Sequence, residues 1–159
     1  MNALLQAKYD PPFTMNIEII STPLRLTICG FSGIAVDKNY VTKAVELMDK
    51  LWPVIKAKGI KNKGKNIWVY EPGEKIFAGV ETDSTVEKNA GLEEKIIHLA
   101  KYACFKHVGP YQLIRQSGEY MISELKLLGF EIISPYVEIY GHWTTDEAAL
   151  ETELIMAIQ

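Results

Sequence analysis

The stretch PYVEIYGHW (135–143) decides the fold, because it has the composition of a strand yet places one carboxylate among apolar and aromatic residues. An earlier triplet, WVY (68–70), matches its centre, EIY (138–140). Side chains alternate between the two faces of a strand, so the first and third residues of each triplet share a face. The two triplets therefore predict equivalent strands, with Trp68 opposite Glu138.

Working outward from these triplets, the order strand, helix, strand, strand occurs twice. The first copy spans about residues 17–83, with extended segments at 17–31, broken near Pro23, and at 67–70 and 75–82. The second spans about 94–158, with extended segments at 94–108, 135–143 and 151–158. Two such units can cover each other's apolar sheet face and hide an edge. We expect one α+β domain over residues 1–159: duplicated βαββ units forming an antiparallel sheet, with pseudo-two-fold symmetry and a central ligand cleft.

Apolar residues at helical spacing mark one helix in each copy. The first helix, capped by Asp37 and stopped or kinked by Pro53, should end by Gly59, and Gly129 should end the second. The residues expected to face the sheet are Val41, Val45, Met48, Trp52 and Ile55 in the first helix, and Ile114, Met121, Leu125 and Leu128 in the second. On these two strands, Val69 and Ile139 should point to the opposite face from Trp68 and Glu138 and cover the helices.

Composition and charge exclude several classes of protein. The chain has 159 residues, 48% of them apolar, and a net charge of -3, so it has no basic surplus for nucleic acid. The basic run at 56–65 is interpreted as a solvated loop, and we expect no direct nucleic-acid binding. No segment approaches the roughly 18 apolar residues of a membrane span, and no signal peptide begins the chain. We expect a cytoplasmic protein that does not associate with membranes.

No metal site or cofactor is expected. Cys29 and Cys104 lie in apolar runs without metal-binding spacing and are interpreted as reduced core residues. The three histidines are scattered, and no Gly-rich nucleotide loop or nucleophile elbow occurs.

Four segments together resemble a known family: YACFKHVGPY (102–111), the helix after it, PYVEIYGHW (135–143) and TELIMAI (152–158). They are similar to the GyrI-like small-molecule-binding family, which includes the effector-binding domains of MerR-type and AraC-type multidrug-responsive regulators. The resemblance covers about residues 17–158 and implies an antiparallel α+β fold with a ligand cleft between two βαββ units. Because about sixteen residues before Ile17 leave no room for a helix-turn-helix, we expect a stand-alone member.

The resemblance implies that Glu138 is the buried acid that meets cationic, lipophilic ligands and that Tyr140 lines the pocket. Ile155 stands where many members have an aromatic residue. From the residues themselves, aromatic side chains can stack on a ligand, and a tyrosine after Gly109-Pro110 can donate its hydroxyl. The candidate ligand-binding residues are Glu138, Tyr140, Trp68, Tyr70, Tyr111 and Trp143. The structural alternatives are that the aromatic residues serve packing, and that Glu138 is exposed or satisfied by a lysine or tyrosine.

Three functions stay open at this point. A carboxylate beside an aromatic face favours a module that binds a lipophilic, cationic molecule for sensing or sequestration, and no nucleophile-base pair suggests an enzyme. The alternative is a hydrolase of electrophilic natural products, in which Glu138 is the catalytic base and a tyrosine the acid. The third is a protein-binding module whose partner is a regulator or DNA gyrase.

Overall fold

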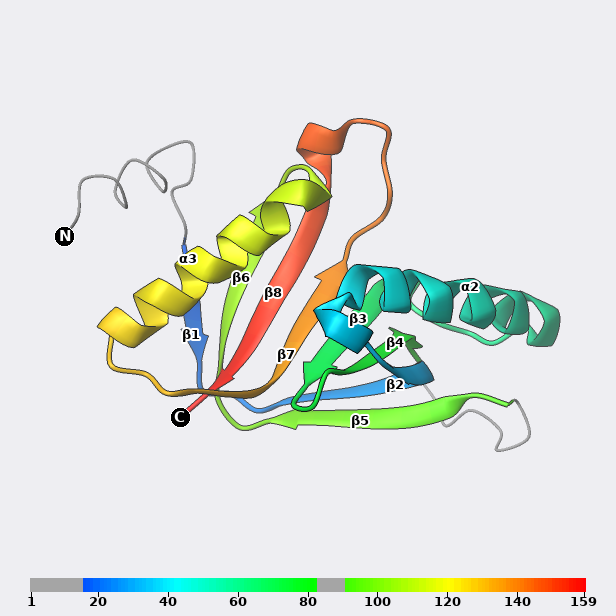
Figure 1. Ribbon diagram of the computed structural model, residues 1–159, viewed down its shortest axis with the longest axis horizontal. Coiled ribbons are helices and arrows are strands. Elements are labelled where there is room, and N and C mark those ends of the chain that lie inside the picture. The colour runs from blue at the N-terminus through cyan, green and yellow to red at the C-terminus, as the bar shows by residue number, and fades with distance from the viewer. Residues whose placement is uncertain (1–15, 83–90) are drawn as a thin grey trace.

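The computed structural model describes residues 16–82 and 91–159, and in these ranges the chain forms an eight-stranded antiparallel sheet and two α-helices (Figure 1). The chain before Asn16 and the expected boundary at residue 83 lie outside the described residues. The strands are β1 (Glu18–Ile20), β2 (Leu24–Ile34), β3 (Asn66–Glu71), β4 (Lys75–Glu81), β5 (Glu93–Leu99), β6 (Tyr102–Val108), β7 (Ile132–Tyr140) and β8 (Glu151–Ile158). The helices are α2 (Tyr40–Lys58) and α3 (Ile114–Leu127), with short 3-10 turns at Val36–Lys38, Tyr111–Leu113 and Glu147–Ala149.

The strands follow the order β1-β6-β8-β7-β3-β4-β2-β5. The strands β1 to β4 of the first half correspond to β5 to β8 of the second. If each strand is replaced by its counterpart and the sheet is read from the other end, the order is the same. The central pair joins the halves, with Trp68 facing Glu138 in the antiparallel register of β3 and β7. The α+β class and the predicted neighbourhood of these two strands are confirmed, whereas superposition of the two halves stays a prediction.

Two long extended segments of the sequence prove to be two strands each. The segment 94–108 is divided at Ala100–Lys101 into β5 and β6, and the segment 17–31 is divided near Pro23 into β1 and β2. The leading strand of each half pairs with the other half, β1 with β6 and β5 with β2. The chain must reverse direction between β1 and β2, and between β5 and β6, for the leading strand to reach the other half. This reversal explains why neither extended segment is a single strand.

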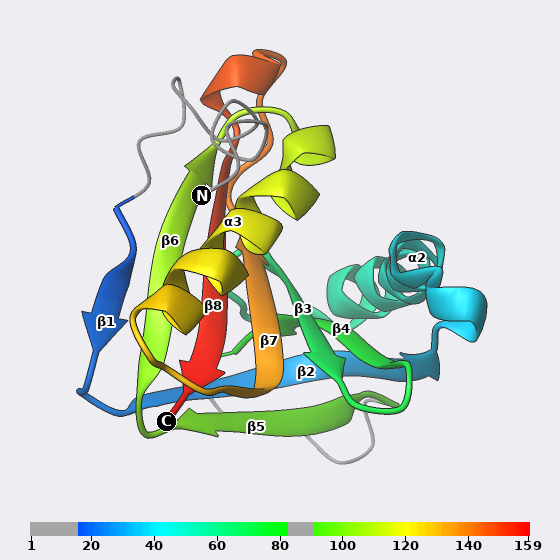
Figure 2. The ribbon, with the colours of Figure 1, turned by 60° about the vertical axis from the view of Figure 1, so that its left-hand side comes forward.

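Both helices pack on the sheet face that carries Trp68 and Glu138, contrary to the expectation that Val69 and Ile139 would cover them. Residues of α2 share a core with β4 and with the rings of Trp68 and Tyr70, and residues of α3 share one with β8 and the rings of Tyr136 and Tyr140. Val69, with Ile139 packed beside it, belongs to a third core that contains no helical residue. Figure 2 shows the reason: β2 and β5 run across the lower end of the central strands, so the bent sheet encloses this core itself.

The buried faces of the helices differ in part from the predicted ones. The buried residues of α2 are Ala44, Leu47, Met48, Leu51 and Ile55, and those of α3 are Ile114, Ser117, Met121 and Leu125. Val41, Val45 and Leu128 were wrong, since all three are exposed, and Trp52 is half-buried with its indole N–H donating to Asn66 Oδ1 at 3.1 Å. The stripe follows Leu47 and Leu51, one turn apart, rather than Val41 and Val45. Helix α2 also continues through Pro53, and Gly59 ends it with φ +59° as predicted.

This shift of the buried stripe can be tested by two truncations on α2. Leu51 is fully buried and Val45 is 46% exposed. We expect Leu51→Ala to lower the free energy of unfolding by about 2 to 5 kcal/mol, because it leaves a cavity in the core. The control, Val45→Ala, should change it by no more than about 0.5 kcal/mol. Chemical denaturation of both variants measures the difference, and equal losses would contradict the assigned helix face.

Candidate ligand-binding site

Glu138 is the centre of a buried cluster of tyrosine hydroxyls. Alternation along β7 places Tyr136, Glu138 and Tyr140 on the helix face, and Glu138 is only 6% exposed. The Tyr70 hydroxyl, from β3, donates to Glu138 Oε2 at 3.1 Å, and the Tyr140 hydroxyl donates to the same oxygen. The Tyr136 hydroxyl also hydrogen-bonds to this carboxyl group. Both halves of the chain therefore supply donors to one carboxylate.

No basic side chain balances this carboxylate in residues 16–82 and 91–159, where the ion pairs involve other acidic groups. Burial raises the pKa of Glu138, and the three tyrosine hydrogen bonds offset that rise only in part. Burial and the adjacent carboxylate together raise the pKa of Tyr70 and of Tyr140. Both phenols stay protonated at neutral pH and remain hydrogen-bond donors.

Aromatic rings enclose the carboxylate. The ring centroids of Trp68 and Tyr140 lie 4.7 Å apart, and those of Tyr70 and Tyr136 are stacked at 5.2 Å. Two further rings close the sides, Tyr111 edge-on to Tyr140 at 5.5 Å and Tyr40 edge-on to Tyr70 at 5.3 Å. Offset and edge-to-face geometries at these distances are attractive, so the rings also stabilise one another by packing. We call this set the aromatic cage: Tyr40, Trp68, Tyr70, Tyr111, Tyr136 and Tyr140.

A buried histidine fixes the turn that carries Tyr111. The Pro110 carbonyl can only accept, so His107 Nε2 donates to it at 3.1 Å, and Nδ1 then accepts from the Ser117 hydroxyl at 2.8 Å. Gly109 beside it has φ +138°, a conformation that side chains rarely adopt. His107 thus ties the turn after β6 to helix α3 and holds Tyr111 against Tyr140.

Four of the six predicted site residues meet in this cluster: Glu138, Tyr140, Trp68 and Tyr70. Tyr111 lies at its rim and is 38% exposed. Trp143 follows the end of β7, is 73% exposed and takes part in none of the ring contacts of this cluster within the described residues. Nothing in the fold brings Trp143 to Glu138.

Tyr136 and Tyr40 also belong to this cluster and were not predicted from the sequence. Tyr136 precedes Glu138 by two residues, so the alternation that selected Tyr140 would also have found it. Tyr40 begins α2 and carried no signal, because its contact with Tyr70 depends on where the helix packs. Ile155 pairs with Val137 in the core on the opposite face, and Leu154 is the residue beside Glu138. The absence of an aromatic residue at Ile155 therefore does not open the aromatic cage.

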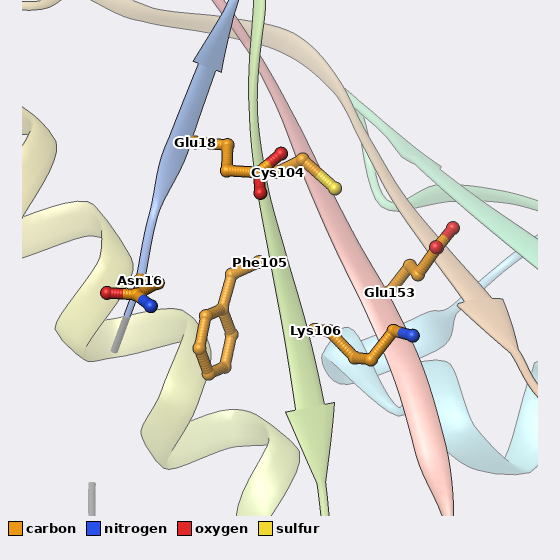
Figure 3. A pocket seen from close by; sticks show the side chains of 6 residues that line it. All are labelled: Asn16, Glu18, Cys104, Phe105, Lys106 and Glu153. Carbon is orange, nitrogen blue, oxygen red and sulfur yellow. The ribbon is translucent and has the colours of Figure 1, made fainter. Parts of the chain in front are cut away.

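Glu138 is only 6% exposed, and neither of the two described hollows includes it, so the expected cleft over this carboxylate is not open in this structure. A hollow of about 390 Å³ lies elsewhere, beside β1, β6 and β8, and Figure 3 shows that its side chains do not converge: Phe105 points away from Cys104 and Glu153. Burial raises the pKa of the Cys104 thiol to about 11, which keeps it protonated and unreactive at neutral pH.

No group of three or more His, Cys, Asp or Glu side chains in the described residues is arranged to hold a metal ion. Neither described helix combines the length and the apolar character that crossing a bilayer requires.

The fold and this enclosed polar-aromatic site define a small-molecule binding domain. The GyrI-like small molecule binding domain family matches residues 39–159, and the chain belongs to this family. No curated protein matches the sequence.

Solved structures share the fold. The C-terminal domain of EcmrR is 12% identical, with a TM-score of 0.69 over 92% of this chain and 99% of that one. SAV2435 bound to tetraphenylphosphonium is 16% identical, with a TM-score of 0.62 over 92% of this chain and 94% of that one. A hydrolase from Listeria innocua is 12% identical, with a TM-score of 0.54 over 98% of both chains. At these identities the likeness concerns the fold alone.

The raised pKa of Glu138 makes stability depend on pH. The folded state binds the proton more tightly than the unfolded state, so the free energy of unfolding falls as pH rises from the ordinary value of 4.5 through the raised pKa. Glu138→Gln removes this contribution. We expect the variant to match the wild type near pH 4 and to equal or exceed it by up to about 1 kcal/mol at pH 8. Urea melts across this range measure the difference.

A structural role for the carboxylate predicts the opposite sign. In that case the hydrogen bonds that the ionised carboxylate accepts stabilise the fold by more than its burial destabilises it. Glu138→Gln should then lower the free energy of unfolding by about 1 to 3 kcal/mol at pH 8. That outcome would contradict a carboxylate retained for ligand binding.

Proposed function

We propose that this domain binds a lipophilic organic cation, with the Glu138 carboxylate as the counter-charge and the surrounding rings as the walls. The observation that carries the proposal is a carboxylate 6% exposed, enclosed by aromatic side chains and without a basic partner in the described residues. A buried charge without a partner destabilises a protein, so its presence needs a compensating role.

A cationic ligand would supply what this site lacks. Its charge would pair with Glu138 and favour the ionised carboxylate, which reverses the effect of burial on the pKa. The electron-rich faces of Trp68, Tyr70 and Tyr140 would each add about 0.5 to 2 kcal/mol of cation–π attraction. The structural similarity to SAV2435, which was solved with tetraphenylphosphonium, supports this class of ligand.

Sensing or sequestration is the role that fits such a site. The rings that cover Glu138 come from α2, β3, β7 and the turn before α3, so a ligand that moves them would alter contacts in both halves of the chain. The similarity in fold to the C-terminal domain of EcmrR, a protein also solved in a complex with DNA, supports a role in which the bound state is read by a partner such as a regulator.

The first test is a titration with tetraphenylphosphonium followed by tryptophan fluorescence or calorimetry. Glu138→Gln should weaken binding by about 10-fold to 100-fold, the equivalent of about 1.4 to 2.7 kcal/mol, because the ligand loses its counter-charge. The matched control is Glu147→Gln, which removes the same charge from an exposed position in the turn before β8. Unchanged affinity in Glu138→Gln would contradict the proposal, and an equal loss in both variants would reduce it to an effect of net charge.

A hydrolase is the second candidate, favoured by the hydrogen bond between Tyr140 and Glu138. In an epoxide opening, water would attack the ring carbon, Glu138 would take the proton of water, and a tyrosine hydroxyl would protonate the leaving oxygen. The raised pKa of Glu138 strengthens it as a base, and the raised pKa of Tyr140 weakens it as an acid.

Turnover of styrene oxide to its diol, followed by chromatography, separates catalysis from binding. In a hydrolase, Glu138→Gln should lower kcat by about 100-fold or more and leave KM nearly unchanged, because the amide keeps the shape and loses the base. Diol formation at the same rate in Glu138→Gln and in the wild-type protein would exclude Glu138 as a catalytic base for this substrate.

A further inference from the structure

Two buried polar side-chain atoms in the described residues have no hydrogen-bond partner, Trp68 Nε1 and Thr152 Oγ1. Both belong to neighbours of Tyr140. The Trp68 ring lies 4.7 Å from the Tyr140 ring, and Thr152, which is fully buried, is the partner of Tyr140 in the register of β7 and β8. Both unpaired buried side-chain atoms of the described residues therefore lie beside the candidate site.

The other two tryptophans show that this is particular to Trp68. The Trp52 indole N–H donates to Asn66 Oδ1 at 3.1 Å, and Trp143 is 73% exposed, where water can accept its hydrogen bond. Buried polar groups in native proteins are almost always paired, so an unpaired indole N–H at a ligand site points to an acceptor that the protein does not supply.

The carboxyl group of this cluster receives its hydrogen bonds from tyrosines and not from Trp68. Glu138 Oε2 accepts from both Tyr70 and Tyr140, and Tyr136 also bonds to this carboxyl group. An indole N–H can donate and cannot accept, and in this structure Trp68 Nε1 donates to none of these groups. An oxygen carried by the ligand would give this N–H a partner.

We infer that the ligand is an organic cation that also carries a neutral hydrogen-bond acceptor, a carbonyl or ether oxygen, for the Trp68 indole N–H. This inference rests on the proposed function: the cationic centre faces Glu138, the oxygen faces Trp68, and the Thr152 hydroxyl on the adjacent strand offers a second polar contact. Tetraphenylphosphonium has no such oxygen and would use only the charge and the rings.

The test compares phenylalkyl-trimethylammonium ions that differ only in one ketone. The parent is 4-phenylbutyl-trimethylammonium, and the series places a ketone at each chain carbon not bonded to nitrogen. At least one ketone should bind wild-type protein about 10-fold more tightly than the parent. Trp68→Phe keeps an aromatic ring and removes the N–H, so this advantage should fall to less than about 2-fold while the parent still binds.

Two controls keep the result specific. Trp52→Phe removes an indole N–H outside the cluster and should leave the ketone-to-parent affinity ratio unchanged. If Trp68→Phe does not fold, benzothienylalanine at position 68 preserves the shape of the indole and replaces N–H by sulfur. The expected loss of the ketone advantage is the same with this residue.

The outcomes separate the two proposals. A parent ion that binds through Glu138, without any ketone that binds more tightly, would overturn the inference and leave the proposed function standing. A ketone advantage that persists in Trp68→Phe or in the benzothienylalanine protein would also overturn it. No binding of the parent or of any ketone to the wild type would contradict the proposed function itself.

Discussion

The pairing of β3 with β7 at the centre of the sheet is the constraint on which the site depends. These two strands join the halves of the chain, and their register sets Trp68 against Glu138 and Tyr70 against Tyr136. Side chains alternate with a period of two, so a slip of one residue in β7 would turn Glu138 into the apolar core on the other face. Backbone hydrogen bonds in the middle of the sheet therefore fix which groups can meet a ligand.

The site also shows how a protein can hold a group that does not favour its own stability. The carboxylate of Glu138 loses its hydration on folding, and three tyrosine hydroxyls restore only part of it. These hydrogen bonds also fix the orientation of the carboxylate, because two of the hydroxyls donate to the same oxygen, Oε2. A ligand that brings a positive charge and moves the rings would thus exchange phenol contacts for an ion pair in a low-dielectric setting.

Sequence alone brought together four residues of the candidate site because strand alternation is a local rule. It placed Trp68 with Tyr70 and Glu138 with Tyr140, and the matching triplets predicted that the two pairs would face each other. The same rule applied once more would have added Tyr136. The buried faces of the helices were harder to predict, because the apolar residues of α2 cover enough of its circumference to allow two buried stripes. Val45 lay in the stripe that proved to be exposed.

What the sequence determined by itself was the alternation, the repeated order of elements and the exceptional carboxylate in PYVEIYGHW, since each depends on neighbours along the chain. Only the tertiary structure decided that the helices cover the face of Glu138, that Tyr40 and Tyr111 close the cage and that Trp143 lies outside it. The physical reason is the bend of the sheet. It lets one face enclose its own core through contacts between distant residues, and it leaves the other face to the helices.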